Sequence, residues 1–215
     1  MRRVLPVVLL VFMAACSMDP EPAPKPAAKT ETGPIALFIG DSLTAGFGVD
    51  PEDSYPALLD ASWRAKGLPW RARNAAISGE TSAGVASEVS WTLTPEVKLV
   101  FICIGGNDGL RGLPTSELRK NLVALIAPLQ KKGLRVALAG MRMPANFGAE
   151  RRREFAAVFP EVARARKIPF MPFLLDGVAG DPALNQGDGI HPNVEGHKKL
   201  AANVAKFLDK EGLLK

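Results

Sequence analysis

The sequence predicts an α/β fold: a three-layer α/β/α sandwich around a central parallel sheet of about five strands. From residue 35 onward, short apolar runs alternate with longer segments of helical pattern. The runs are rich in Ile, Val, Leu and Phe, which is the composition of strands buried on both faces. Alternating strands and helices form a parallel sheet with helices on both sides, joined by right-handed crossovers.

Length and composition fit one globular domain with additions. The chain has 215 residues, of which 47% are hydrophobic and 23% charged, so it is not a disordered protein. The formal net charge is +5, but the basic residues are scattered apart from the clusters at 151–153 and 198–199. Neither cluster is interleaved with aromatic residues, so no nucleic-acid partner is predicted.

Residues 1–15 have the pattern of a secretory signal peptide. The basic start, Met1-Arg2-Arg3, precedes an apolar run over 4–15 that ends in two small residues, Ala14-Ala15. This run is too short for a membrane span, which needs roughly 20 apolar residues. The chain is therefore predicted to be exported.

Residues 12–16, Phe-Met-Ala-Ala-Cys, resemble the bacterial lipoprotein box, in which the cysteine becomes the lipidated N-terminus. The resemblance implies a membrane anchor at Cys16, and Ser17 after it implies the outer membrane, facing the periplasm. Ordinary signal cleavage beside a chance cysteine is the alternative. Proline recurs through 16–34, so this segment is predicted to be a semi-rigid tether, and 35–215 the folded domain.

The elements of the domain follow in order along the chain. The expected strands are 35–39, 70–74, 99–104, 135–139 and 169–172. The expected helices are 55–66, 83–93, 115–132, 150–166 and 193–210. In such sheets the site lies beyond the carboxyl ends of the strands, so the residues that follow each strand are the candidates for chemistry.

Three strand ends carry suitable groups. The first strand ends in Gly-Asp-Ser at 40–42, which exposes the hydroxyl of Ser42 at a turn. Gly79 follows the second strand, and without a Cβ its backbone N–H can approach a ligand closely. Asn107 follows the third strand and offers an amide donor. Together these groups favour a serine nucleophile beside donors for a developing negative charge.

The sequence has only two histidines, so few groups could serve as the base. His191 lies in the loop before the last helix, with Asp188 three residues earlier, near enough to orient the imidazole through its Nδ1 proton. His197 falls within the helix over 193–210 and is expected on its surface. His191 is therefore the predicted base.

The four blocks at 40–43, 79, 105–108 and 188–192 resemble the SGNH/GDSL hydrolase superfamily, over about residues 35–208. The segments at 105–112 and 177–186 resemble the sequences of one bacterial periplasmic branch of the superfamily. That branch consists of arylesterases, acyl-thioesterases and lysophospholipases. The resemblance implies a flavodoxin-like sandwich with Ser42 as nucleophile, His191 as base and Asp188 as its partner. It places the oxyanion hole at the Ser42 and Gly79 N–H groups and the Asn107 side chain.

The leading hypothesis is an anchored serine esterase that hydrolyses arylesters and short- to medium-chain esters through an acyl-enzyme, with lysophospholipids and acyl thioesters as further candidates. A carbohydrate O-acetylesterase of the cell envelope is the alternative, followed by a non-catalytic lipid- or glycan-binding lipoprotein. The chemistry requires no cofactor, and no Cys/His cluster suggests a metal.

Several neighbours of the site are assigned from the sequence. Asp41 is expected to fix its turn through side-chain-to-backbone bonds, while a structural and a chemical role are both open for Asp108. Cys103 is expected to be a small buried hydrophobe. Four loop residues either line an acyl groove or pack beneath the loops: Leu43, Phe47, Leu110 and Phe147.

Overall fold

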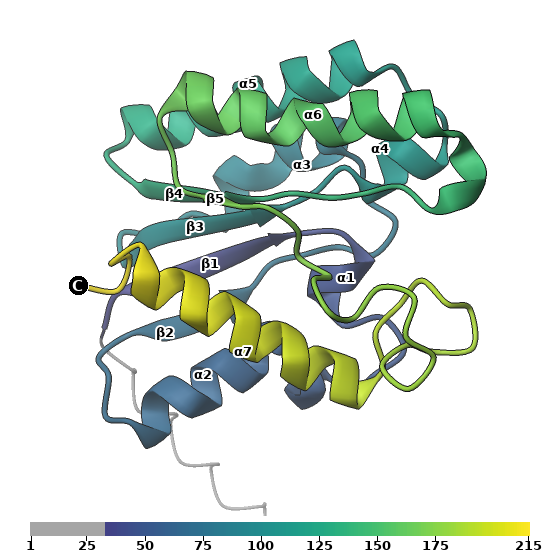
Figure 1. Cartoon of the computed structure of the whole chain (residues 1–215). Coiled ribbons are helices and arrows are strands. Elements are labelled where there is room, and N and C mark those ends of the chain that lie inside the picture. The colour runs from purple at the N-terminus through teal and green to yellow at the C-terminus, as the bar shows by residue number, and fades with distance from the viewer. Residues whose placement is uncertain (1–32) are drawn as a thin grey trace, which may run out of the picture. The chain divides into compact units, whose positions relative to one another are not determined.

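The sheet has five parallel strands in the order β2-β1-β3-β4-β5 (Figure 1). The computed structural model describes residues 33–215; the predicted signal peptide, Cys16 and all but the end of the predicted tether lie outside these described residues. The strands are β1 (Ile35–Gly40), β2 (Arg71–Asn74), β3 (Val97–Cys103), β4 (Arg135–Ala139) and β5 (Phe170–Met171). The predicted parallel sheet is confirmed.

Helices cover both faces of the sheet, which confirms the three layers (Figure 1). One face carries α3 (Ser82–Glu88), α5 (Thr115–Lys131) and α6 (Ala149–Arg166), and the other carries α2 (Tyr55–Ala65) and α7 (Val194–Lys210). The sequence did not predict two short helices at strand ends, α1 (Ser42–Ala45) and α4 (Gly106–Leu110). Three 3-10 turns complete the elements: η1 (Pro51–Asp53), η2 (Val89–Thr92) and η3 (Ala145–Phe147). No helix within 33–215 is long and apolar enough to cross a membrane.

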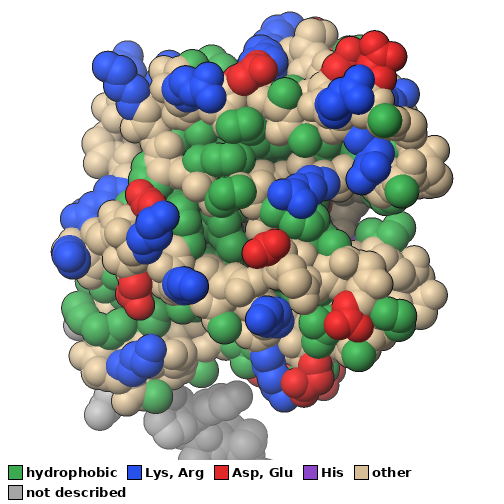
Figure 2. All heavy atoms as spheres, viewed as in Figure 1, with side chains coloured by type: hydrophobic (Ala, Val, Ile, Leu, Met, Phe, Trp, Pro, Cys, Tyr) green, Lys and Arg blue, Asp and Glu red, His purple; other side chains and the backbone are tan. Residues whose placement is uncertain are grey.

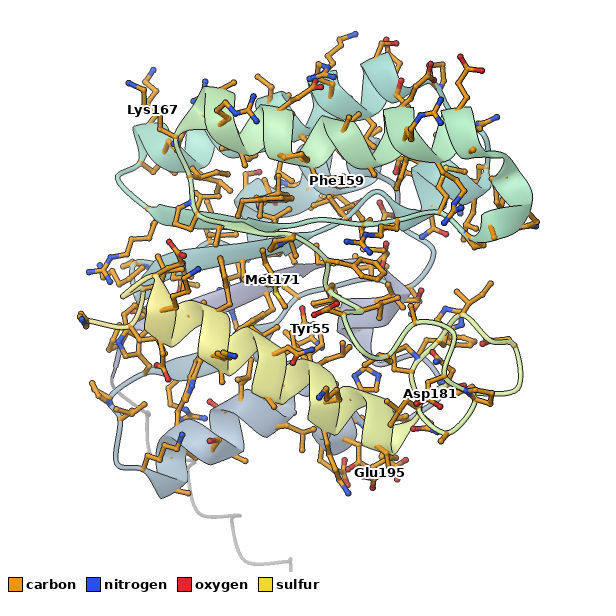
Figure 3. All side chains as sticks on the ribbon, viewed as in Figure 1. Tyr55, Phe159, Lys167, Met171, Asp181 and Glu195 are labelled. Atoms are coloured by element: carbon orange, nitrogen blue, oxygen red, sulfur yellow. The ribbon has the colours of Figure 1, made fainter. Side chains whose placement is uncertain are left out.

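The core lies on both sides of β1 and β3, whose side chains are almost all buried. Figure 3 places Phe159 of α6 and Tyr55 of α2 on opposite sides of the sheet, and both are fully buried. Each such apolar side chain contributes roughly 1.5–3 kcal/mol when it leaves water. Cys103 is buried as predicted, with its Sγ 3.5 Å from the Sδ of Met141.

The strand order fixes where a ligand can bind. The chain moves from β1 to β2 on one side and then crosses to β3 on the other side of β1. Loops that leave β1 and β3 therefore diverge, and open α/β sheets bind ligands in the resulting crevice at the carboxyl ends. Ser42 follows β1 and Asn107 follows β3, so both lie at this crevice.

Candidate active site

Ser42 is the first residue of α1, and only Asp41 separates it from the end of β1. Asp41 caps this helix: its Oδ1 accepts a hydrogen bond from the Leu43 N–H at 3.1 Å, the turn-fixing role predicted for it. Gly40 is required before the turn, because a Cβ there would lie 2.3 Å from the carbonyl oxygen of Cys103. The first N–H groups of a helix have no acceptor within it, so the Ser42 N–H is left for another partner.

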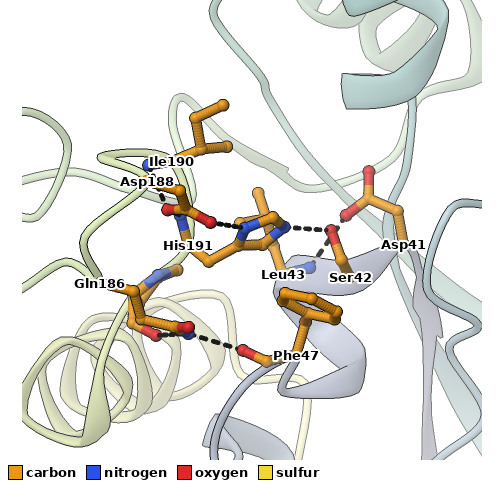
Figure 4. A network of polar contacts seen from close by, with 9 residues as sticks. Asp41, Ser42, Leu43, Phe47, Gln186, Asp188, Ile190 and His191 are labelled. Atoms are coloured by element: carbon orange, nitrogen blue, oxygen red, sulfur yellow. Dashed lines mark hydrogen bonds and ion pairs between the residues drawn. The ribbon is translucent and has the colours of Figure 1, made fainter.

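The predicted triad residues lie in one hydrogen-bonded chain (Figure 4). The Oγ of Ser42 is 2.9 Å from Nε2 of His191, and Nδ1 of His191 is 2.6 Å from Oδ2 of Asp188. An ionised carboxylate only accepts hydrogen bonds, so Nδ1 donates to it and Nε2 is free to accept the Ser42 hydroxyl proton. The geometry suits transfer of that proton to the imidazole.

Asp188 is held by its own loop. Its Oδ1 accepts the backbone N–H of Ile190 at 2.9 Å and of His191 at 3.0 Å. Hydrogen bonds from the backbone and ring of His191, and from the Ile190 N–H, lower the pKa of Asp188 to about 2. The carboxylate therefore stays ionised throughout the range in which most enzymes are assayed, although its side chain is 40% exposed.

Gln186 joins the loop of the base to the loop of the nucleophile. Its Nε2 donates to the carbonyl oxygens of Phe47, at 2.6 Å, and Pro192, at 2.9 Å (Figure 4). Its backbone N–H donates to the carbonyl of His191 at 2.8 Å. The ring of Phe47 lies 4.7 Å from that of His191. Residues far apart in the sequence thus fix the position of the imidazole over Ser42.

The two other predicted oxyanion donors differ in their surroundings. Asn107 lines the same cavity as Ser42, and its Nδ2 donates one hydrogen to the carbonyl of Glu80 at 2.8 Å. That bond orients the amide and leaves its second hydrogen for a ligand. Gly79 has φ 84°, and its carbonyl accepts a hydrogen bond from Nη2 of Arg111 at 2.8 Å, but it is not part of the cavity wall.

The cavity at this edge has a volume of about 580 Å³ and is mostly apolar. In Figure 2 the surface is hollowed between α6 and the loop before α7. Ser42, Asn107 and His191 lie on its wall. Sequence reasoning did not place the remaining lining residues at the site; they include Met141, Arg142, Met143, Arg152, Phe155, Phe173 and Leu175.

Comparison with known proteins identifies the family. Residues 38–199 match the model of the GDSL-like lipase/acylhydrolase family, which is most of the chain. The chain belongs to the GDSL-like lipase/acylhydrolase family. The resemblance drawn from its four sequence blocks is thereby confirmed, and the region matched contains all the predicted triad residues.

Similar members of the family are esterases. "Esterase TesA" of Pseudomonas aeruginosa is 38% identical over 169 residues, which are 78% of this chain and 84% of that protein. "Thioesterase 1/protease 1/lysophospholipase L1" of Escherichia coli is 34% identical, over 80% of this chain and 82% of that protein. The crystal structure of the psychrotrophic esterase EstA from Pseudoalteromonas sp. has a TM-score of 0.79 at 30% identity, covering 82% of this chain and 97% of EstA. This GDSL-like protein is likewise a carboxylic ester hydrolase.

The expectation for His197 was wrong. This residue of α7 is fully buried, and its Nδ1 accepts the backbone N–H of Tyr55 at 3.2 Å. Asp108 has a structural role, since it accepts the backbone N–H and the hydroxyl of Ser82 at the start of α3. Among the loop hydrophobic residues with two possible roles, Leu43 and Leu110 line the cavity, whereas Phe147 packs against the core.

Burial shifts the pKa of two side chains, Asp41 and His197, in opposite directions. Burial raises the pKa of Asp41 from 3.8 to about 6, so the stability it contributes is full below pH 3.8 and is lost as the pH rises through about 6. Burial lowers the pKa of His197 from 6.5 to about 4, so its contribution is full above pH 6.5 and is lost as the pH falls through about 4. Between about pH 4 and pH 6, a rise in pH therefore lowers the stability through Asp41 and raises it through His197.

Asp41→Asn removes one of these opposed effects. The free energy of unfolding of the variant, relative to wild type, is expected to rise by roughly 2.4 kcal/mol between pH 4 and pH 7, because only the wild type must bury an ionised carboxylate at the higher pH. Urea unfolding at both pH values measures this difference. Asp50→Asn, at an exposed position in the same region, is the matched control. An Asp41→Asn difference that is independent of pH would contradict the assignment.

Proposed function

We propose that this protein is a serine esterase that cleaves acyl esters through Ser42, His191 and Asp188 and a covalent acyl-enzyme. The observation that carries the proposal is the chain of contacts from Ser42 Oγ to His191 Nε2, at 2.9 Å, and from His191 Nδ1 to Asp188, at 2.6 Å. A serine hydroxyl is a weak nucleophile at neutral pH and needs such a base.

Each step has a residue to perform it. Ser42 Oγ bonds to the carbonyl carbon while its proton passes to Nε2 of His191, and Asp188 stabilises the imidazolium that forms. The oxyanion accepts hydrogen bonds from the Ser42 N–H, the free hydrogen of the Asn107 amide and the Gly79 N–H. The intermediate collapses as His191 protonates the leaving alcohol or thiol. Water then attacks the acyl-enzyme by the same steps and frees Ser42.

The proposed substrates are arylesters and short- to medium-chain acyl esters, with lysophospholipids and acyl thioesters as further substrates. The apolar lining of the cavity suits an acyl chain, and the relatives' names include esterase, thioesterase and lysophospholipase.

A panel of 4-nitrophenyl acetate, butyrate and octanoate tests this range. A burst of 4-nitrophenol of about one equivalent, before a slower steady rate, is the expected sign of an acyl-enzyme. Absence of hydrolysis of every ester would refute the proposal, and acetate release confined to acetylated glycans would favour the carbohydrate O-acetylesterase.

Asn107→Ala is expected to lower kcat by roughly 10²–10³ with little change in KM, because the amide bonds the oxyanion more strongly than the ground-state carbonyl. Steady-state kinetics on 4-nitrophenyl butyrate measure both constants. Asn121→Ala is the control, since the Asn121 amide also donates a hydrogen bond near the site, to the hydroxyl of Ser82 at the start of α3, but does not line the cavity. Equal losses in the two variants would mean that Asn107 acts only by holding the loop.

We also propose that the enzyme is exported and anchored by a lipid at Cys16, on the outer membrane and facing the periplasm. The support is the sequence of residues 1–17 alone. Two or three acyl chains hold a protein stably on a membrane. Metabolic labelling with an alkyne fatty acid tests the anchor: label that persists in Cys16→Ser would refute it.

A further inference from the structure

The wall of the catalytic cavity contains two arginines that the proposed mechanism does not use. Arg142 follows β4 at the carboxyl edge of the sheet, and Arg152 lies in the first turns of α6. Both line the cavity that also contains Ser42 and His191.

Both guanidinium groups are held by the cavity wall itself. The Cζ of Arg142 lies 4.5 Å from the ring centroid of Phe173, which also lines the cavity. Nε of Arg152 donates to the carbonyl of Met143 at 3.0 Å. A guanidinium fixed through one face or one N–H keeps its other N–H groups for a ligand, and little further entropy is lost when the ligand binds.

No acidic side chain neutralises these arginines within residues 33–215. Other arginines of the chain do form ion pairs, such as Arg119 with Glu161 and Arg71 with Asp60. The only acidic residue on the cavity wall is Asp41, which is buried and accepts the backbone N–H groups of Leu43 and Gly106. The cavity therefore combines two unpaired cations with an apolar surface.

We propose that Arg142 and Arg152 form a subsite for an anionic group, a carboxylate or phosphate, on the ester that Ser42 attacks. The inference rests on the proposed function and narrows its substrate class to acyl esters that carry a negative charge. Planar guanidinium groups match the oxygens of both anions, and such charge-assisted hydrogen bonds are about twice as strong as neutral ones. The remaining wall, which includes Leu43, Leu110, Phe155 and Ile190, would contact the apolar part of the same molecule.

The charge could lie on the acyl side or on the alcohol side of the ester, and two matched substrate pairs separate these cases. In the methyl ester of mono-4-nitrophenyl adipate a neutral ester replaces the carboxylate at the end of the acyl chain, and release of 4-nitrophenol is measured for both compounds. Hexanoylglycerol 3-phosphate and hexanoylglycerol differ only by a phosphate on the alcohol. The measured quantity is the ratio of kcat/KM for the charged member to that for the neutral member, at low and at high salt.

The wild-type ratio is expected to exceed one for at least one pair and to fall as salt increases, because salt screens the attraction. Arg142→Gln together with Arg152→Gln is expected to lower that ratio at least tenfold, which corresponds to about 1.4 kcal/mol of transition-state binding. Arg142→Lys keeps the charge and is expected to retain part of the preference. It also tests the subsite if the double variant does not fold.

Arg153→Gln is the matched control, because Arg153 is exposed on the same helix and does not line the cavity. The ratio should be unchanged in this variant. A wild-type ratio of one or below for both pairs, or a ratio that the Arg142 and Arg152 substitutions leave unchanged, would overturn the subsite. Neither result would contradict the proposed esterase mechanism. That mechanism would be contradicted only if the neutral esters were not cleaved either.

Discussion

Replacing Ser42 with alanine is expected to lower kcat for 4-nitrophenyl butyrate by roughly 10³–10⁶, with KM nearly unchanged. The substitution removes the atom that would form the covalent bond, while the cavity and the oxyanion donors stay in place. Donors and binding alone still accelerate attack by water, so a small residual rate is expected. Steady-state kinetics with purified protein measure the loss.

The stability of Ser42→Ala should change little. The Ser42 hydroxyl bonds only the imidazole of His191, and net hydrogen bonds of this kind contribute about 1 kcal/mol. Ser78→Ala, in the exposed loop after β2, is the control for removal of a hydroxyl near the same edge. If the Ser42 and Ser78 variants both retain wild-type rates, the hydrolysis proceeds without this serine.

Asp188→Asn is expected to lower kcat by roughly 10²–10⁴. The two backbone N–H groups of Ile190 and His191 can still bond the amide oxygen, so the side chain should keep its position. Its NH₂ group would then face Nδ1 of His191 and favour the tautomer in which Nε2 carries the proton. That imidazole cannot accept the Ser42 proton. The partial exposure of Asp188 lets water replace some of its effect, which explains the wide range.

Asp181→Asn provides the matched comparison for Asp188→Asn. Asp181 also accepts a backbone N–H, that of Ala183 at 2.9 Å, in the same long loop before α7, but it does not contact His191. Its substitution should leave kcat within about twofold, as expected for an exposed turn residue remote from the triad. Equal losses in both variants would assign the effect to loop structure and not to the imidazole.

Much of the fold was predictable because the apolar runs are short and the helices long. Each predicted strand overlaps an observed one, and the predicted helix at 55–66 corresponds to α2. The two missed helices, α1 and α4, have only four and five residues, too few for a 3.6-residue period to be visible. They are formed by tertiary contacts at the strand ends and by the cap that Asp41 supplies to α1.

The site was predictable where local pattern and topology agree. Ser42, Asn107 and the pair of Asp188 and His191 each follow a rule about strand ends or loop spacing. His197 was misplaced, although it begins an apolar stripe on α7 that continues at Leu200, Val204 and Leu208. That spacing was the available signal for its burial.

The arginines of the cavity show what sequence reasoning leaves out. Arg142 follows β4 and could have been found by asking what every strand delivers to the carboxyl edge. Arg152 has no such signal, because it reaches the cavity from the start of a helix and only through packing of α6 over the sheet. Convergence of this kind depends on tertiary structure and has no local pattern.

The most direct test of the central claim is the site of covalent modification by a fluorophosphonate ester in the folded enzyme. A fluorophosphonate reacts much faster with a serine that a neighbouring base activates than with an ordinary serine. Peptide mass mapping after inactivation should place one phosphonate on Ser42 and find none in the Ser42→Ala protein. An enzyme that hydrolyses 4-nitrophenyl esters but carries the phosphonate on another residue, or on none, would contradict the account.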